Sequence, residues 1–494
     1  MTSSETPRTP SSVLIVGAGV FGLSTAHALA QRPSYSKTKI VLVDPHTSIP
    51  SYTTATTASV DNTRIIRADY SDPYYAELAA QAQEYWRQTG DNQLGGQGRY
   101  SECGLHLTSQ RGKEGYVRKA LENVRRLQGV DERGIPELVG AKQIAEAMRA
   151  PGAAIGSGEV GYVNTQSGWA DAERSMRWLW EKVKATNRVE FITGRASKVL
   201  TDGKTALGVQ LENGKKLFAE LTILATGAWT GTLVDLCGVA SPRAQCIGYL
   251  SLTQDETKAL KEIPVHLNLA TGLFYFPPSA DGELKVARHA FGYSNPTTIP
   301  APLGSGTGVE TITTTIPAFP PAIPSIDEQV LIDFVNSSLL TLENRPKPVE
   351  KLRHSRLCWY MDTASSDFLV CPYPGYGSSL YLATGGSGHG FKFLPVLGSK
   401  IVDVIDGTDT RTNKSVWTQK WAWPGRGTSQ HTPSGVTDAY VDEAGEIWCL
   451  DGSRGGEMGL KLAEALAGKQ QSPRALSEIT KRKSGSETSG KSRL

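Results

Sequence analysis

Short runs of apolar residues alternate with a helix-forming segment near the start of the chain. Residues 13–16 and 40–43 are continuous apolar runs rich in β-branched residues, which is typical of strands buried on both faces of a parallel sheet. Between them, residues 22–31 are rich in alanine and leucine, which favours a helix. Together these segments predict a β–α–β unit.

Helical spacing recurs further along the chain. Apolar residues at helical intervals, together with good helix formers, predict three more helices, at residues 74–88, 112–126 and 174–185. Residues 199–227 instead alternate as strands do. Their two turn sequences, Asp202-Gly203 and Asn213-Gly214, predict that these strands form a β-meander.

The middle of the chain differs in composition. Residues 241–345 are richer in proline, threonine and short β-like runs, and we expect them to form a separate layer with an antiparallel sheet. Residues 380–384 predict another buried strand, which runs into a cluster of glycines. Both ends of the chain, residues 1–11 and residues from 470 onward, are polar and are predicted to be disordered.

Length and composition fit a globular enzyme of two or three domains. The 494 residues exceed what one hydrophobic core usually holds. A net charge of +3 gives no reason to expect a nucleic-acid partner, and no apolar run approaches the roughly 18–20 residues that a membrane span needs. The six cysteines lie far apart without a CxxC pair, so we expect neither a disulfide framework nor a metal site.

A glycine fingerprint follows the first predicted strand. Gly17, Gly19 and Gly22 stand where that strand enters its helix. The first permits a tight turn, the second lets the backbone approach a pyrophosphate, and the third lets helix and strand pack closely. The pyrophosphate would bind the free N–H groups at the helix N-terminus. Asp44, at the end of the next strand, is placed to bind a ribose hydroxyl pair.

The sequence LTILATGAW, at residues 221–229, favours FAD over NAD. A hydrophobic strand that follows a β-meander and ends in Ala-Thr-Gly, here at Gly227, resembles the second nucleotide contact of FAD-binding proteins with the two-dinucleotide fold. We therefore expect FAD as the cofactor.

Four longer strings carry a resemblance to a known family: NTRIIRADYSDPYYAELAAQAQEYW, ELKVARHAFGY, RLCWYMDTASSDFLV and ATGGSGHGFKFLP, at residues 62–86, 283–293, 356–370 and 383–395. From residue 12 to around residue 425, the chain resembles the D-amino-acid-oxidase superfamily. It is most similar to the branch that contains monomeric sarcosine oxidase, the pipecolate and saccharopine oxidases, and the fungal fructosyl amino acid oxidases (amadoriases).

The resemblance implies an α/β fold with two domains. One is a Rossmann-type FAD-binding domain (two-dinucleotide fold), and the other is an α+β substrate domain with a mainly antiparallel sheet. We expect a discontinuous FAD-binding domain at residues 12–108, 157–237 and 365–425. The substrate domain would take residues 109–156 and 238–364, followed by a C-terminal extension at 426–469 and a disordered tail at 470–494.

The resemblance implies four residues on the substrate side. Arg67 would clamp the substrate carboxylate, because a guanidinium offers a rigid bidentate fork that stays charged. Lys285 would lie near the flavin N5 and activate oxygen, and His289 would hold the substrate or tune its amine. Tyr360 matches an active-site tyrosine. The spacing of Lys285 and His289 favours the sarcosine, pipecolate and saccharopine oxidases over the amadoriases.

The resemblance also implies a set of flavin contacts. Cys358 would bear FAD covalently through an 8α-S-cysteinyl bond, and Arg64 would lie near the flavin ring. Lys392 would lie near the pyrimidine edge, where a positive charge stabilises the anionic reduced flavin. The last string would contact the ring closely through Gly385, Gly386, Gly388, His389 and Gly390.

One departure concerns the substrate pocket. Phe274 stands where sarcosine oxidase has a tyrosine that closes a small pocket, which argues against a substrate as small as sarcosine. Trp169, Trp229 and Trp359 are candidates for a wider aromatic lining that suits a bulkier side chain.

The implied reaction is oxidation of the carbon–nitrogen bond of an amino acid, or of an N-substituted (for example N-methyl) amino acid, to an imine while O₂ is reduced to H₂O₂. Alternatives are a fructosyl amino acid oxidase, an alkaloid-pathway amine oxidase whose imine cyclises, a flavin dehydrogenase with an acceptor other than oxygen, and a flavoprotein without catalytic activity. We expect a monomer whose partners are the small amine and oxygen.

The last three residues, Ser492, Arg493 and Leu494, vary the S-K-L peroxisomal address by one basic residue. They predict recognition by a peroxisomal import receptor and a peroxisomal location, with the cytoplasm as the alternative.

Overall fold

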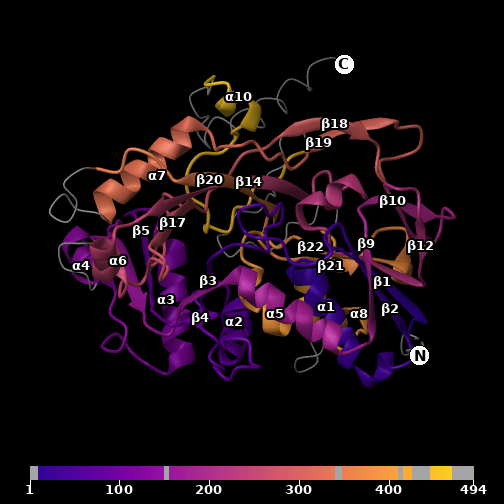
Figure 1. The fold of residues 1–494 in the computed structure, drawn as a ribbon, viewed down its shortest axis with the longest axis horizontal. Coiled ribbons are helices and arrows are strands. Elements are labelled where there is room, and N and C mark those ends of the chain that lie inside the picture. The colour runs from indigo at the N-terminus through magenta and orange to yellow at the C-terminus, as the bar shows by residue number, and fades with distance from the viewer. Residues whose placement is uncertain (1–8, 149–154, 340–347, 410–415, 425–444, 470–494) are drawn as a thin grey trace, which may run out of the picture.

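The computed structural model describes residues 9–148, 155–339, 348–409, 416–424 and 445–469 (Figure 1). The predicted tail from residue 470, including Ser492-Arg493-Leu494, lies outside the described residues, and so does most of the polar N-terminus. In the ranges that are described, no helix is long and apolar enough to cross a membrane.

A six-stranded sheet contains the predicted nucleotide-binding turn. In spatial order its strands are β21 (Leu369–Pro372), β22 (Leu380–Thr384), β13 (Leu221–Leu224), β1 (Ser12–Val16), β2 (Lys39–Asp44) and β9 (Val189–Thr193). All neighbours are parallel except β21 and β22. The central strands β1 and β13 are almost entirely buried, as their continuous apolar sequences predict.

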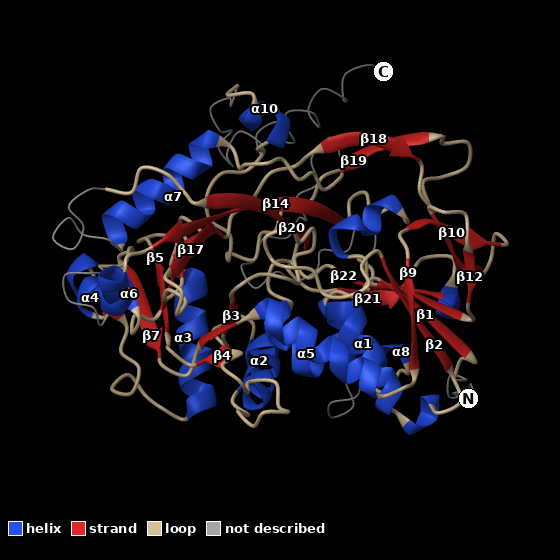
Figure 2. Cartoon of the chain, in the orientation of Figure 1, coloured by secondary structure: helices blue, strands red, loops and turns tan. Residues whose placement is uncertain are grey.

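Four helices pack together beside this sheet (Figure 2). They are α1 (Val20–Gln31), α2 (Pro73–Trp86), α5 (Ala172–Ala185) and α8 (Leu394–Ile405). Helix α1 contacts both α5 and α8, and α2 contacts α8. The side chain of Asp72 accepts hydrogen bonds from the first backbone N–H groups of α2, and Pro73 occupies the first turn, so the sequence itself starts this helix. The predicted β–α–β unit and the helices at 74–88 and 174–185 are confirmed.

An eight-stranded sheet forms the second large layer. In spatial order its strands are β20 (His354–Thr363), β14 (Ala240–Ser251), β17 (Glu283–Arg288), β16 (Leu273–Tyr275), β15 (Val265–Asn268), β5 (Leu105–Ser109), β7 (Val160–Asn164) and β6 (Leu138–Val139). Neighbours are antiparallel except β15 and β5. This confirms the mainly antiparallel sheet expected for the substrate side.

The predicted domain boundaries do not follow the strands everywhere. They place residues 105–108 and 160–164 in the FAD-binding domain, whereas β5 and β7 lie in the eight-stranded sheet. Both strands pair by backbone hydrogen bonds with partners remote in sequence, and no local pattern announces such pairing. Elsewhere the boundaries stay a prediction.

Helices also flank the eight-stranded sheet. They are α3 (Gly115–Gln128), α4 (Ala141–Glu146), α6 (Gln254–Leu260) and α7 (Ser325–Ser338). Helix α3 contacts β5 and β7, and α7 contacts β14 and β17. The helix predicted at 112–126 is confirmed, with its start at Gly115.

Smaller sheets complete the described fold. The predicted meander is confirmed for β10 (Ala196–Thr201), β11 (Ala206–Leu211) and β12 (Lys216–Phe218), but β13 leaves it and joins the six-stranded sheet. The other small sheets combine β3 (Arg64–Ile66), β8 (Gly168–Ala170) and β4 (Tyr100–Ser101), and β18 (Pro296–Pro300) with β19 (Thr311–Thr315). Two short helices, α9 (Val416–Lys420) and α10 (Leu462–Leu466), follow.

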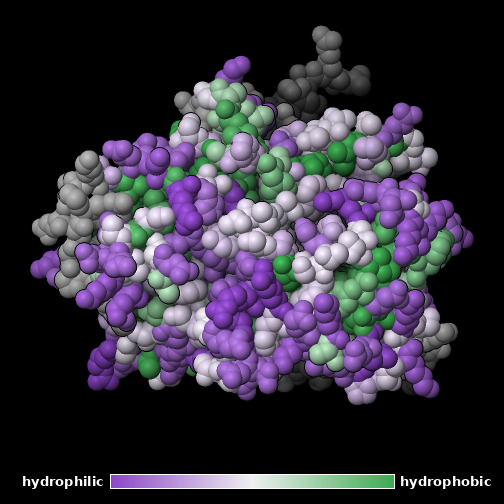
Figure 3. All heavy atoms as spheres, in the orientation of Figure 1, coloured by the Kyte–Doolittle hydropathy of each residue, from purple (hydrophilic) through white to green (hydrophobic). Residues whose placement is uncertain are grey.

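The two large sheets lie side by side, with β14 and β20 running above the region between them (Figure 1). Hydrophilic side chains cover much of the face shown in Figure 3. Residues of both large sheets line the main cavity, so the candidate site lies at their junction.

Candidate flavin and substrate site

A cavity of about 880 Å³ opens at the carboxyl ends of β1 and β2. The glycine turn lines it, together with Asp44 and the first residues of α1. A Cβ atom at Gly17 would lie 2.6 Å from the carbonyl oxygen of Ala225, and one at Gly22 would lie 1.8 Å from that of Gly17. Only glycine fits these two positions, and the N-terminus of α1 therefore opens directly into the cavity.

Asp44 holds the turn in place. Its Oδ2 accepts a hydrogen bond of 2.8 Å from the backbone N–H of Ala18, and its Oδ1 accepts one of 2.9 Å from that of His46. The carboxylate is thus fixed at the rim of the cavity. This location matches the role expected of a residue that binds ribose hydroxyls.

The cavity extends from Asp44 to the glycine-rich string after β22. Gly227, which begins the short 3₁₀ helix η2 (Gly227–Thr232), lines its middle. Gly386, Gly388, Gly390, Arg64 and Tyr360 line its far end. Gly388 has a φ of +67°, and a Cβ atom there would lie 2.4 Å from the Tyr360 ring. A long cavity with glycines at both ends fits FAD, with the dinucleotide turn at one end and room for a flat ring system at the other.

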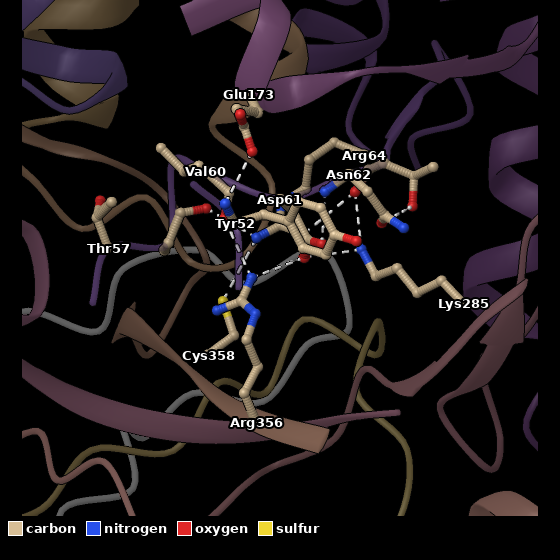
Figure 4. Close-up of polar contacts among 12 residues, drawn as sticks. Tyr52, Thr57, Val60, Asp61, Asn62, Arg64, Glu173, Lys285, Arg356 and Cys358 are labelled. Atoms are coloured by element: carbon tan, nitrogen blue, oxygen red, sulfur yellow. Dashed lines mark hydrogen bonds and ion pairs between the residues drawn. The ribbon is translucent and has the colours of Figure 1, made fainter. Parts of the chain in front are cut away.

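A buried charge cluster lies beside that far end (Figure 4). We define the Asp61 cluster as Asp61, Arg64, Tyr249, Lys285 and Arg356. The Nζ of Lys285 lies 2.8 Å and the Nη2 of Arg356 3.0 Å from Asp61 Oδ2, which Arg64 also contacts. The Tyr249 hydroxyl donates to Asp61 Oδ1 at 2.7 Å. One carboxylate therefore faces three cations, and the cluster carries a positive excess in a region screened from water.

Within the Asp61 cluster, burial and the neighbouring charges shift the pKa values of Asp61 and Lys285 in opposite directions. Burial alone would raise the pKa of Asp61, but Arg64, Lys285 and Arg356 hold it well below its usual value. Burial lowers the pKa of Lys285 to about 7, although the Asp61 carboxylate opposes that shift. The Lys285 ammonium also donates 2.7 Å to the carbonyl oxygen of Thr63. Lys285 is thus fixed in position and can change protonation near neutral pH.

Cys358 is buried on β20, next to the Asp61 cluster. The Nη2 of Arg64 lies 3.5 Å from its Sγ atom (Figure 4). Arg64 and Tyr360, which flank Cys358 in the fold, line the cavity, whereas Cys358 and Lys285 are not among its described lining residues.

A second, small pocket of about 30 Å³ adjoins the flavin end of the cavity. The two spaces meet at the Ser387–Gly388 segment, because Ser387 lines the small pocket and Gly388 lines the large one. We call it the substrate pocket. Its described lining includes Arg67, Tyr70, Tyr116, His289, Ser387, His389, Asp451 and Ser453.

Arg67 is buried in the substrate pocket and has a free donor. Its guanidinium carbon lies 4.8 Å from the centre of the Tyr70 ring and 5.9 Å from that of Tyr116. Its Nη1 atom is buried and has no hydrogen-bond partner among the described residues. An unpaired buried guanidinium nitrogen is unfavourable unless a ligand satisfies it, so this atom indicates an anion site.

A chain of hydrogen bonds fixes the wall between Arg67 and the glycine-rich string. Lys392 Nζ donates 2.9 Å to the Tyr70 hydroxyl, which lies 2.9 Å from His389 Nδ1. The other ring nitrogen, Nε2, lies 2.8 Å from the carbonyl oxygen of Ser366. Burial and the charge of Lys392 hold the pKa of His389 well below its usual value, so the ring is neutral with its proton on Nε2. The order of donors then runs from Lys392 through Tyr70 to His389.

A segment near the C-terminus returns to this pocket. We call residues 445–469 the return segment. The Nη2 of its Arg454 donates 2.8 Å to Asp362 Oδ1 and 2.9 Å to the carbonyl oxygen of Ser387. Its Nη1 lies 2.8 Å from the ring nitrogens of His289, and the guanidinium lies 5.2 Å from the centre of the Tyr360 ring. The return segment thus contacts both His289 and Tyr360.

Comparison with known proteins decides the family. The family described as FAD dependent oxidoreductase (DAO) matches residues 12–404. The chain belongs to this family.

Relatives of this oxidoreductase are oxidases of amino acids and amines. It is 32% identical to amino acid oxidase imqH of Aspergillus flavus over 80% of its own length and 93% of that protein. It is 27% identical to L-saccharopine oxidase of Schizosaccharomyces pombe over 83% and 92%. Among solved structures, fructosamine oxidase (amadoriase II) of Aspergillus fumigatus superposes with a TM-score of 0.66 at 26% identity and covers 84% of this chain and 89% of that one.

These matches confirm the predicted resemblance and fold. The chain is an FAD-dependent oxidoreductase of the amino acid oxidase type. The residues present also fit the cofactor, as the glycine cradle and the long cavity show.

The structure brings most of the predicted site residues of the oxidoreductase together but separates the aromatic ones. Trp229 and Trp359 line the flavin cavity, and Trp169 packs against the apolar cluster under α3. In the described lining of the substrate pocket none of the three occurs. The three tryptophans therefore do not supply an aromatic lining to this pocket among the residues described. Phe274 lies edge-on to Phe276, whose ring is 5.0 Å from the Lys285 ammonium.

Three residues with clear contacts in the site have no counterpart in the sequence prediction. Asp61 immediately precedes the string that begins at Asn62, so its position next to that string is the signal that marks it. Arg454 and Asp451 lie in the sequence DGSRGG, which is typical of a surface turn and gives no indication of a site. They also lie outside the part of the chain that the family matches.

Proposed function

We propose that this oxidoreductase oxidises the carbon–nitrogen bond of an amino acid or an N-substituted amino acid to an imine and reduces O₂ to H₂O₂. The observation that carries the proposal is the buried, unpartnered Nη1 of Arg67 in a pocket that adjoins the flavin end of the cavity. FAD supplies the redox chemistry, accepting a hydride from the substrate and passing two electrons to oxygen.

The residues of the chain supply binding, orientation and charge. Arg67 offers its free donor to the substrate carboxylate, and the Tyr70 ring fixes the guanidinium. His289, held by Arg454, faces the same pocket as a neutral ring, since burial and the Arg454 charge hold its pKa well below the usual value. A neutral ring adds no positive charge beside the amine, and hydride loss is faster from an uncharged amine.

Lys285 supports an oxygen-reactive site rather than a dehydrogenase. Its ammonium is buried against the Asp61 carboxylate, in the cluster beside the flavin end of the cavity. A fixed cation in a dry site stabilises the negative charge that develops on oxygen during reduction. The flavin dehydrogenase remains the alternative from another class, and reaction with air separates the two.

A fructosyl amino acid oxidase is the second candidate within the oxidases. The observation in its favour is the match to the amadoriase II structure over most of both chains. The closer identity to an amino acid oxidase and the Lys285–His289 pair support the first candidate.

Anaerobic reduction of the bound flavin tests the proposal. The purified protein would be mixed with N-methyl amino acids, pipecolate, saccharopine, sarcosine and a fructosyl amino acid while the visible absorption of the flavin is recorded. Air would then be admitted and peroxide assayed. We expect bleaching by amino acids with a free carboxylate, followed by fast reoxidation with peroxide. A flavin that none of these amines bleaches would contradict the proposal, and slow reoxidation would indicate the dehydrogenase.

We further propose that FAD is attached to the Cys358 sulfur. The position of the sulfur supports it, because Cys358 lies 3.5 Å from Arg64, a residue that lines the flavin end of the cavity. Protein precipitated with acid should keep its yellow colour in the wild type and lose it to the supernatant in C358A. The matched control is C371A, a second buried cysteine on β21, which should keep the colour. Release of all flavin from the wild type would rule out the bond.

A further inference from the structure

Two residues of the return segment line the substrate pocket. Asp451 and Ser453 stand in its wall together with Arg67, Tyr70 and Tyr116. The family match ends at residue 404, so this part of the wall comes from outside the matched region. The return segment is therefore a place where this chain can set its own substrate preference.

The Asp451 carboxylate is held rigidly through one of its two oxygens. Oδ1 accepts hydrogen bonds from the backbone N–H of Ser453 at 2.9 Å, from its hydroxyl at 2.6 Å, and from the Cys449 thiol at 3.3 Å. No hydrogen bond or ion pair to Oδ2 comes from the residues described. Three donors on Oδ1 orient the group, and Oδ2 keeps its capacity to accept.

The other carboxylates of the pocket are already paired. Lys420 lies 2.9 Å from Asp72 Oδ2 and 3.2 Å from Asp367 Oδ1. Arg67, in contrast, has an unpartnered buried nitrogen. Among its described groups the pocket thus offers one free cationic donor and one free anionic acceptor, at different points of its wall.

We propose that Asp451 is a specificity-determining residue that accepts a hydrogen bond from a hydroxyl or ammonium group on the substrate side chain. This rests on the proposed function, in which Arg67 takes the α-carboxylate. An apolar substrate side chain would displace water from Oδ2 without replacing its hydrogen bond. The free-energy cost of that desolvation is large because the carboxylate is charged and partly buried. A site built to pair with a polar group rejects the analogue that lacks it more strongly than an apolar pocket rejects an extra methylene.

The test compares matched substrates in four proteins. The pairs are N-methylalanine with N-methylserine, N-methylphenylalanine with N-methyltyrosine, and N-methylnorleucine with Nα-methyllysine. Within each pair the two members differ only in the donor group. That group is a hydroxyl in the first two pairs and an ammonium in the third. For each protein the ratio of kcat/KM within a pair is measured, so that general losses of activity cancel. The proteins are the wild type, D451N, D451A and E457Q, the last an exposed carboxylate of the same segment as matched control.

In the wild type we expect the donor-bearing member to be preferred by about 10-fold to 100-fold in at least one pair. D451A should bring that ratio to about 1, and E457Q should keep the wild-type value. D451N separates the two donor types. Its amide oxygen still accepts from a hydroxyl but carries no charge, so it should keep most of a hydroxyl preference and lose an ammonium preference.

Two results would overturn the inference while the proposed function stands. One is a wild-type ratio near 1 in every pair although the substrates bleach the flavin. The other is an unchanged ratio in D451A, whose folding is checked by its flavin spectrum and melting temperature. If no N-methyl amino acid or other amine of the panel reduces the wild-type flavin, the proposed function fails, and this inference fails with it.

Discussion

At the scale of single residues, Lys285 links the charge of the site to pH. Its pKa of about 7 means that the ammonium is present below neutral pH and is lost as pH rises. If this cation assists oxygen reduction, reoxidation of the reduced protein should slow as pH rises through about 7. Stopped-flow mixing of the reduced protein with oxygen between pH 6 and 8.5 measures this. A wild-type rate that does not change over this range would contradict the role of Lys285.

Two variants, D61N and K285M, test whether Lys285 is the group whose titration causes this pH dependence. The Asp61 carboxylate raises the pKa of Lys285, so D61N should move the midpoint to lower pH. K285M should remove the dependence and slow reoxidation, by about 100-fold if the ammonium acts as a typical electrostatic catalyst. A midpoint that stays in place in D61N would show that another group titrates.

Only some of the residues in the site could be predicted from the sequence. Arg67, Lys285, His289 and Lys392 belong to strings whose residue order is specific. Arg67 and His289 line the substrate pocket, Lys392 donates to Tyr70 in its wall, and Lys285 pairs with Asp61. Asp61 also pairs with Lys285 and Arg356, and Arg454 pairs with Asp362, and these partners are more than 90 residues away. A single sequence contains no local pattern for such pairs, because any aspartate or arginine can stand at the surface instead.

At the scale of secondary-structure elements, β5 and β15 carry a histidine pair. His106 and His266 are register partners on these parallel strands, both fully buried, with ring centres 5.0 Å apart. Burial lowers the pKa of His106 to about 4 and holds that of His266 well below its usual value. The unfolded chain, with its histidines near 6.5, therefore binds more protons below that pH, and acid destabilises the fold.

The shifted pKa of His106 alone should lower the free energy of unfolding by about 2 kcal/mol when the pH falls from 7.5 to 5. Urea unfolding at both pH values measures this loss, and H106F should show a smaller one. H46Q is the contrasting control. A hydrogen bond that the His46 ring donates to the Asp44 carboxylate raises the pKa of His46, so that this histidine stabilises the fold below its unfolded pKa, and H46Q should show a larger loss. Equal losses in the wild type and H106F would contradict the account.

The return segment is attached through buried ion pairs. Arg454 pairs with Asp362 at 2.8 Å, and Glu446 pairs with Arg243 at 3.0 Å. R454M should lower the free energy of unfolding by about 3–5 kcal/mol, because it leaves the Asp362 carboxylate buried without its partner. In the double variant R454M/D362N that charge is absent, so much of the loss should be recovered. Urea unfolding of the two variants measures both free energies of unfolding. A double variant less stable than R454M would contradict the predicted recovery.

Predictability at this scale depended on whether an element is defined locally. The β–α–β unit has its apolar strands, glycine turn and Ala/Leu-rich helix within one stretch, and it was predictable from sequence. Strand β13 lay within the range predicted as a meander and was also predicted to be the hydrophobic strand of a nucleotide contact, and the local pattern does not decide between the two sheets. Its pairing with β1 and β22 is decided by burial of Leu221–Leu224 on both faces, which only the assembled sheet provides.

At the scale of the whole molecule, the site exists only where the two large sheets meet. The six-stranded sheet supplies the turn after β1 and the glycine-rich string after β22, and the eight-stranded sheet supplies Lys285 on β17 and Tyr360 on β20 (Figure 1). The return segment closes the substrate pocket from a third direction. The family resemblance made the first two contributions predictable. The third lies outside that resemblance, and the structure was needed to find it.

The most direct test of the account is the rate at which a substrate reduces the flavin anaerobically, measured for an amino acid and for its carboxamide. The wild type should prefer the free acid by about 100-fold, because the carboxylate pairs with the buried Arg67 donor. R67Q should abolish most of that preference, whereas R126Q, an arginine on α3 that pairs with Glu77 away from the pocket, should keep it. Equal rates for acid and amide in the wild type, or a full preference in R67Q, would contradict the account.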